Sequence, residues 1–107
     1  MASVVEEQIQ SMTQRIVREC DPLEVLLFGS WARGDAASDS DVDLLVILPD
    51  GTRRRPAAIA LRRALDSGPL ACDVLVVTPE DVRRRGRIAG SVLRAALREG
   101  KVLYARP

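Results

Sequence analysis

Asp41 and Asp43 stand one residue apart at the start of the apolar run DVDLLVIL, which ends at Leu48. Buried strands rarely carry carboxylates, because removing such a charge from water costs on the order of several kcal/mol unless a partner compensates. Residues i and i+2 of a strand share a face, so the two carboxylates project together while Val42 projects into the core. A divalent cation would remove their repulsion, and hard oxygen ligands suit Mg²⁺ or Mn²⁺. Asp41 and Asp43 are therefore candidate metal ligands.

The Asp41 and Asp43 pair has two alternative interpretations. Taken alone, Asp-x-Asp is typical of an exposed strand end that binds no metal. A calcium-binding EF-hand loop would use the alternating acids Asp39, Asp41 and Asp43, but Leu44 stands where that loop needs glycine. The acids also lead into a strand instead of a turn, so the EF-hand is excluded and the plain strand end stays open.

Gly29 and Ser30 end an earlier apolar run, and ten residues lie between Ser30 and Asp41. A glycine at a strand end lets the backbone approach a ligand closely, and a serine that opens a helix offers a hydroxyl and free N–H groups to an anion. Simple helix capping would also account for Ser30. Together with the acidic pair, the two residues predict a site where phosphates meet a metal. The sequence has neither a Walker phosphate loop nor a Gly-x-Gly-x-x-Gly dinucleotide motif.

The chain has 107 residues, 47% of them hydrophobic, and no histidine. This length predicts one domain, residues 1–107. Without histidine, acid–base chemistry falls to carboxylates, and the usual zinc sites lack ligands. We expect Cys20 and Cys72 to be reduced, with a disulfide as the alternative. No apolar run approaches the ~20 residues of a membrane span and the N-terminus resembles no signal peptide, so we expect a soluble cytoplasmic protein.

The net charge is +1, which gives no overall attraction to nucleic acid. The basic residues are nevertheless clustered. Such runs are typical of solvated helix faces, and the alternative is a phosphate-rich ligand or an acidic partner. The clusters are Arg53-Arg54-Arg55, Arg62-Arg63, and Arg83-Arg84-Arg85 with Arg87.

The apolar periodicity predicts an α/β domain with a small three-stranded mixed sheet and flanking helices. Ser30 is the predicted N-cap of a short helical stretch that ends at Gly34, and Thr78 is the predicted N-cap of a later helix. The inward face of the helix over 56–66 is predicted to carry Ile59, Leu61, Ala64 and Leu65. The tail KVLYAR is expected to be a short extended piece on the core. The predicted helices cover about 3–20, 30–34, 56–66, a segment opening at 79, and 91–98, and the predicted strands cover 23–28, 41–48 and 71–78.

The stretch GSWARGDAASDSDVDLLVI resembles the minimal nucleotidyltransferases of the polymerase-beta-like superfamily. The chain length, the third strand and the ending REGKVLYAR extend the resemblance over essentially the whole chain. It implies the polymerase-beta-like nucleotidyltransferase fold. It also implies that Gly29 and Ser30 bind a nucleotide triphosphate and that Asp41 and Asp43 hold two Mg²⁺ ions, or Mn²⁺.

The resemblance further implies a third carboxylate on a following strand, and Asp73 in CDVLVV is the best match. It would reach the same metals if its strand lies beside that of Asp43; otherwise it is a polar strand end or a partner for an arginine. Arg33 follows Ser30 and is a candidate for binding the triphosphate, with an exposed surface position as the alternative. Trp31 is expected to pack against the core instead of stacking on a base.

The implied reaction transfers a nucleoside monophosphate, AMP from ATP, to a hydroxyl and releases pyrophosphate. Minimal nucleotidyltransferases also resemble the antitoxins of toxin–antitoxin pairs, which implies a HEPN-type helical toxin as partner and a tyrosine on it as acceptor. Nucleic acid is not required, and self-association stays open. The alternatives are a non-catalytic module that neutralises a partner by occlusion, or a transferase acting on a small molecule or an RNA end. The base preference and the acceptor are not determined by the sequence.

Overall fold

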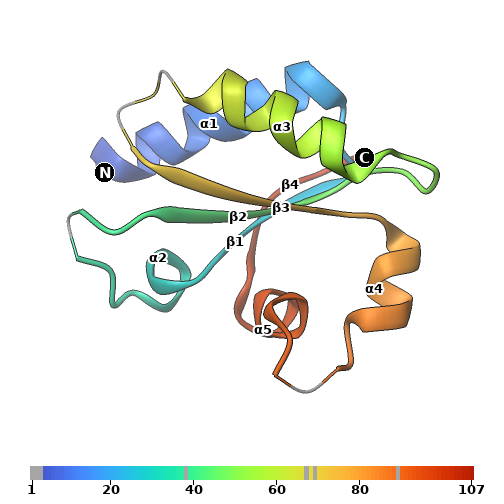
Figure 1. Cartoon of the computed structure of the whole chain (residues 1–107). Coiled ribbons are helices and arrows are strands. Elements are labelled where there is room, and N and C mark those ends of the chain that lie inside the picture. Colours follow the sequence, from blue (N-terminus) through green and yellow to red (C-terminus); the bar gives the residue numbers. More distant parts are fainter. Residues whose placement is uncertain (1–3, 38, 67, 69, 89) are drawn as a thin grey trace.

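A computed structural model shows a sheet with helices on both faces (Figure 1). It describes residues 4–37, 39–66, 68, 70–88 and 90–107. The helices are α1 (Val4–Cys20), α2 (Ser30–Arg33), α3 (Arg54–Leu65), α4 (Pro79–Arg85) and α5 (Val92–Glu99), and the strands are β1 (Glu24–Phe28), β2 (Val42–Ile47), β3 (Cys72–Val77) and β4 (Lys101–Ala105).

The sheet has the order β3-β2-β1-β4, with β2 and β3 parallel and the other neighbours antiparallel. The predicted mixed sheet is confirmed, but the prediction of three strands is wrong. The tail forms β4, which pairs with β1 and satisfies backbone groups that β1 would otherwise leave open at its edge. Arg106 continues this pairing by donating its backbone N–H to the carbonyl of Leu23 at 2.8 Å.

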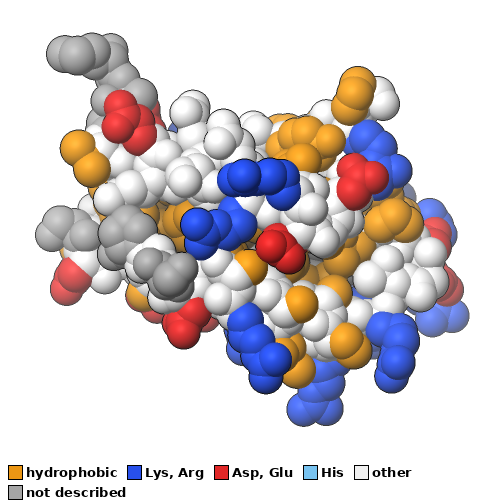
Figure 2. Space-filling view, turned by 90° about the horizontal axis from the view of Figure 1, so that it is seen from above, with side chains coloured by type: hydrophobic (Ala, Val, Ile, Leu, Met, Phe, Trp, Pro, Cys, Tyr) orange, Lys and Arg blue, Asp and Glu red, His pale blue; other side chains and the backbone are white. Residues whose placement is uncertain are grey.

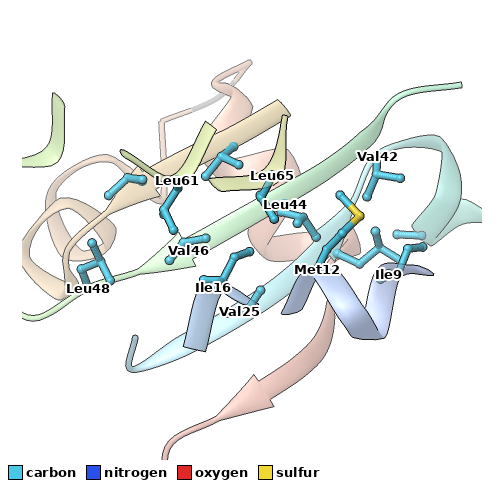
Figure 3. Packing of buried hydrophobic residues seen from close by; sticks show 14 residues of the cluster. Ile9, Met12, Ile16, Val25, Val42, Leu44, Val46, Leu48, Leu61 and Leu65 are labelled. Atoms are coloured by element: carbon cyan, nitrogen blue, oxygen red, sulfur yellow. The ribbon is translucent and has the colours of Figure 1, made fainter. Parts of the chain in front are cut away.

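Residues of β2 alternate between two apolar layers. Val42, Leu44 and Val46 belong to a core with α1 and α3 on one face of the sheet. Figure 3 shows Val46 beside Ile16 and Leu61, and Val42 at the other end of the cluster near Ile9. Leu45 and Ile47 belong to a second, smaller cluster with residues of α5. Figure 1 shows α2, α4 and α5 on this other side. Burial on both faces explains why the run after Asp43 is continuously apolar.

The helices on the larger core follow their apolar periodicity. In α1 the buried residues Ile9, Met12 and Ile16 recur at three- and four-residue steps. The predicted start at Ser3 lies outside the described residues. In α3 the inward prediction holds for Leu61 and Leu65, but it is wrong for Ile59, which is 46% exposed. Leu61 lies two helical steps after Ile59, which is about 200° around the axis, so both cannot face the sheet.

Two helices begin at side-chain caps. The sequence predicts the first cap, Thr78, but it places Ser91 inside the last helix. Thr78 is the N-cap of α4 and forms a reciprocal capping box with Asp81. Ser91 is the N-cap of α5 and accepts a hydrogen bond from the backbone N–H of Arg94 at 3.0 Å. The α5 helix extends to Glu99, one residue beyond its predicted end, and this residue reaches the site described below.

The arginine clusters are exposed, in agreement with solvated helix faces. Figure 2 shows Lys and Arg side chains scattered over the face covered by α1 and α3, with Asp and Glu side chains among them. Some of the clustered arginines form surface ion pairs with acids: Arg54–Asp81, Arg83–Asp50 and Arg84–Glu80.

Cys20 and Cys72 are both free thiols and partly buried, so the expectation of reduced cysteines is confirmed. In the part of the chain that the structure describes, no helix has the length and apolar character that a bilayer crossing would need.

Candidate active site

The parallel pairing of β2 and β3 brings Asp43 and Asp73 side by side, because the two residues are direct register partners. Both lie near the start of their strands, and both side chains project to the α5 side of the sheet. Asp41 lies just before β2, which begins one residue later than predicted. The N–H of Val42 donates to the carbonyl of Ala71 at 2.9 Å and holds the segment containing Asp41 beside the start of β3. The three predicted carboxylates therefore meet at one end of the sheet.

The negative charges of these carboxylates repel one another, which disfavours the ionised form of Asp43. Partial burial raises the pKa of Asp43, and the nearby charges of Asp73 and Asp41 raise it further, while Arg33 acts in the opposite direction. A cluster of hard oxygen donors with unbalanced negative charge has the chemistry that suits Mg²⁺ or Mn²⁺. Among the described residues, however, no three acidic, cysteine or histidine side chains already converge as a metal cage. The donor types fit such an ion, and the carboxylates would have to close around it.

Gly29 is required at its position by Asp43. Phe28 is the register partner of Asp43, so the backbone of Gly29 passes close to that carboxylate. A Cβ atom on Gly29 would overlap Oδ2 of Asp43 and lie 3.1 Å from its Cγ, and φ of Gly29 is +75°. Side chains rarely adopt this backbone conformation. The sequence explains Gly29 by the close approach of a ligand. The structure adds a second reason, which is the close approach of the Asp43 carboxylate.

The short helix α2 starts differently from the prediction. Gly29 is its N-cap and Ser30 its first helical residue, so the assignment of Ser30 as N-cap is wrong. The reason is the positive φ of Gly29, which turns the chain from β1 directly into the helix. Within the described residues the hydroxyl of Ser30 has no hydrogen-bond partner, so it is available to a ligand. Gly34 ends α2 as predicted.

Trp31 ties α2 to the segment that precedes the acidic pair. Its ring packs against the larger core, as expected, and its Nε1–H donates to the carbonyl of Ser40 at 2.9 Å. Ser40 is the residue before Asp41. Trp31 thus helps to hold the loop between the Gly-Ser pair and the aspartates, a role that the sequence did not indicate.

Arg33 lies beside a fourth carboxylate, that of Glu99, at the end of α5. Nη1 of Arg33 is 3.2 Å from Oε1 of Glu99, and Nε is 3.2 Å from Oδ2 of Asp35. Glu99 also accepts a hydrogen bond from the backbone N–H of Gly29 at 3.1 Å. Sequence reasoning missed Glu99. Its position follows from the pairing of β1 with β4, since continuing the register from Leu27 and Lys101 places Glu99 opposite Gly29.

A hollow of about 390 Å³ lies beside Asp73 and is lined in part by Arg62 and Cys72. Burial, followed by the charges of Asp73 and Asp43, raises the pKa of the Cys72 thiol to about 12. This thiol is therefore protonated near neutral pH and is no nucleophile. A larger hollow of about 830 Å³ lies between α1 and β4 and contains none of the candidate site residues.

Comparison with protein families gives a match over residues 6–104 to the nucleotidyltransferase domain. A protein of Methanocaldococcus jannaschii that is provisionally named a protein adenylyltransferase is 38% identical over 56 residues. That alignment covers 47% of this chain and 38% of the relative. The chain therefore matches little more than a third of the length of this curated relative.

Several solved structures share the fold. A protein of Sulfolobus solfataricus, provisionally described as a nucleotidyltransferase, superposes with a TM-score of 0.64 at 18% identity, over 94% of this chain and 79% of that one. A toxin–antitoxin structure with AMP-PNP gives a TM-score of 0.52 at 27% identity, over 91% and 73%. A mutant of the toxin–antitoxin MntA-HpeT gives 0.53 at 22% identity, again over 91% and 73%.

Proposed function

This chain belongs to the nucleotidyltransferase domain family, and we propose that it transfers AMP from ATP to a hydroxyl group of a partner protein, with release of pyrophosphate. The observation that carries the proposal is the strand register that pairs Asp43 with Asp73. This pair lies next to Asp41 and next to the Gly29-Ser30 turn. One end of the sheet thus presents acidic oxygens and anion-binding groups together. We also propose that residues 1–107 act as one domain, because the candidate site residues all lie at one end of a single sheet.

The triphosphate would be held by Gly29, Ser30 and Arg33. The hydroxyl of Ser30 is available for a phosphate oxygen, and the guanidinium of Arg33 supplies positive charge beside the acidic cluster. These groups would fix the leaving pyrophosphate and orient the α-phosphate toward the acceptor.

Asp41, Asp43 and Asp73 would hold two Mg²⁺ ions, or Mn²⁺. When bound, the ions would lower the pKa of the attacking hydroxyl and neutralise the charge of the departing pyrophosphate. Asp73 lies beside Asp43 on the α5 side of the sheet and would accept the proton of the acceptor hydroxyl at its carboxylate. A carboxylate is the natural group for this step in a chain without histidine.

The partner would be a HEPN-type helical toxin, with this chain as its antitoxin. Support comes from the toxin–antitoxin structure with AMP-PNP, which is 27% identical to this chain, and from the adenylyltransferase name of the archaeal relative. The HEPN identity rests on the resemblance of the Gly-Ser and Asp-x-Asp stretch to minimal nucleotidyltransferases. The cytoplasm is the compartment that a donor such as ATP implies.

The proposal is tested by incubating the chain and its partner protein with Mg²⁺ and ATP labelled at the α-phosphate. We expect label on the partner, and none when the γ-phosphate carries it. Asp41→Asn or Asp43→Asn should reduce transfer by on the order of 10³-fold, because each removes a charge that holds the metals. Asp39→Asn is the matched control, since Asp39 is an exposed acid of the same loop. A partner that is neutralised without being labelled would contradict transfer and favour occlusion.

A further inference from the structure

Glu99 occupies a position that is electrostatically unfavourable for an acid. It is the last residue of α5, where the helix dipole presents its negative end. Its charge also adds to that of the acidic cluster, since it contributes to the raised pKa of Asp43. An acidic side chain remains in such a place only if specific donors compensate for it.

Two donors provide this compensation, and both belong to the proposed triphosphate site. The backbone N–H of Gly29 donates to Oε1 of Glu99 at 3.1 Å. Nη1 of Arg33 lies 3.2 Å from Oε1 and 3.4 Å from Oε2. Carboxylate and phosphate oxygens accept from the same kinds of donor, so Glu99 holds the groups that a phosphate would need.

The backbone of Glu99 is fixed, while its side chain has a route away from the site. A Cβ atom on the next residue, Gly100, would overlap the carbonyl of Ala96 and lie 3.1 Å from Cδ2 of Leu26, so the chain turns tightly from α5 into β4. The pairing of Leu27 with Lys101 anchors β4 just beyond this turn. The side chain of Glu99 is 27% exposed, so it can rotate toward solvent without moving the helix.

We propose that Glu99 is an internal anion that occupies the triphosphate-binding groups of the free chain and has to leave them before a polyphosphate binds. This inference rests on the proposed function for the assignment of Gly29 and Arg33. Apparent affinity falls by the fraction of molecules in which Glu99 has released these donors, so removing the carboxylate tightens polyphosphate binding.

The test uses inorganic tripolyphosphate with Mg²⁺ as the probe and the full chain in wild-type, Glu99→Gln and Glu99→Ala forms. Calorimetry gives the dissociation constant, and the amide NMR signal of Gly29 reports whether binding occurs at this turn. If Glu99 occupies the donors in about nine of ten molecules, both variants bind about tenfold more tightly than wild type. Asp35→Asn is the matched control, because Asp35 contacts Arg33 without touching Gly29, and its affinity should stay within about twofold.

Equal or weaker binding by both Glu99 variants would overturn the inference, because it would make Glu99 a support for Arg33 instead of a competitor. Absence of tripolyphosphate binding in every form would overturn it as well. The transfer assay separates this result from the proposed function. If the wild type transfers AMP but the Glu99 variants bind tripolyphosphate no more tightly, only the inference about Glu99 is wrong. If the variants bind more tightly but no form transfers AMP, only the proposed reaction is wrong.

Discussion

Asp43 is paired across the sheet with Phe28 on one side and with Asp73 on the other. This position makes it the centre of the acidic cluster and places it against Gly29. At the scale of single residues, the site therefore combines two costs, which are repulsion between carboxylates and a backbone conformation that only glycine adopts easily. Each cost can be measured by substitution.

Asp43→Asn should stabilise the metal-free protein near neutral pH by a few tenths to about 1 kcal/mol, since the raised pKa belongs to a partly exposed group and is screened. A raised pKa means that the folded state binds more protons than the unfolded state just above the ordinary aspartate value of 3.8. The free energy of unfolding of the wild type should therefore decrease as pH rises through this window. The Asn variant should lack this decrease, because asparagine does not titrate. Urea unfolding in EDTA at several pH values measures the stability difference and its pH dependence. An Asn variant less stable than the wild type would contradict repulsion between the carboxylates.

Gly29→Ala should destabilise the chain by on the order of 2–4 kcal/mol, because strain at φ +75° and the overlap with Asp43 add together. In an Asp43→Ala background the overlap with the carboxylate disappears, while the backbone strain and the 3.3 Å approach to the Cβ of residue 43 remain. The cost of Gly29→Ala should then be smaller by at least about 1 kcal/mol. Equal costs in the two backgrounds, measured by urea unfolding, would show that the carboxylate does not constrain Gly29.

At the scale of elements, α4 lies at the opposite end of β3 from the acidic cluster and is held by local hydrogen bonds. Thr78 and Asp81 form its capping box, and Asp50 accepts the backbone N–H of Glu80 at 2.9 Å. Partial burial disfavours ionised Asp81, but hydrogen bonds from Thr78 outweigh it and lower its pKa. The hydrogen bond from Glu80 likewise lowers the pKa of Asp50. These carboxylates therefore support α4 through polar contacts and take no part in the site.

Asp81→Ala should cost about 1 kcal/mol near neutral pH through loss of the capping box. A lowered pKa means that this stabilisation is present above 3.8 and disappears as pH falls through the folded-state value. The difference between wild type and variant in urea unfolding should therefore shrink in acid. Glu80→Ala is the matched control, because the side chain of Glu80 forms an exposed pair with Arg84 and its loss should cost less than about 0.5 kcal/mol. A pH-independent difference would contradict the capping role.

At the scale of the whole molecule, the sheet joins segments that are distant in the chain. The tail pairs with β1, and Glu99 lies against Gly29, 70 residues away. The acidic cluster, the Gly29-Ser30 turn and the end of α5 thus occupy one end of a single sheet. Ligands at this end should stabilise the whole fold, because its parts are present together only when the chain is folded.

Mg²⁺ with a non-hydrolysable ATP analogue, at about 100 times its dissociation constant, should raise the melting temperature by on the order of 10 °C. Chelation of the metal by EDTA should remove this effect, because the carboxylates would again repel one another. Thermal unfolding followed by circular dichroism measures the change. Asp43→Asn should show little response, whereas the loop variant Asp39→Asn should respond like wild type; an equal response in all three would contradict the site.

The sequence by itself determined the periodic elements, the mixed α/β architecture and the residues whose types suit phosphate and metal chemistry. These features are local, since apolar spacing and the Gly-Ser and Asp-x-Asp stretch can be recognised within short segments. Only the tertiary structure decided the fourth strand, the adjacency of Asp73 and Asp43, and the contact of Glu99 with Gly29. Strand partners and their register depend on backbone hydrogen bonds between remote segments, and a short tail such as KVLYA carries no local signal of the strand it will join.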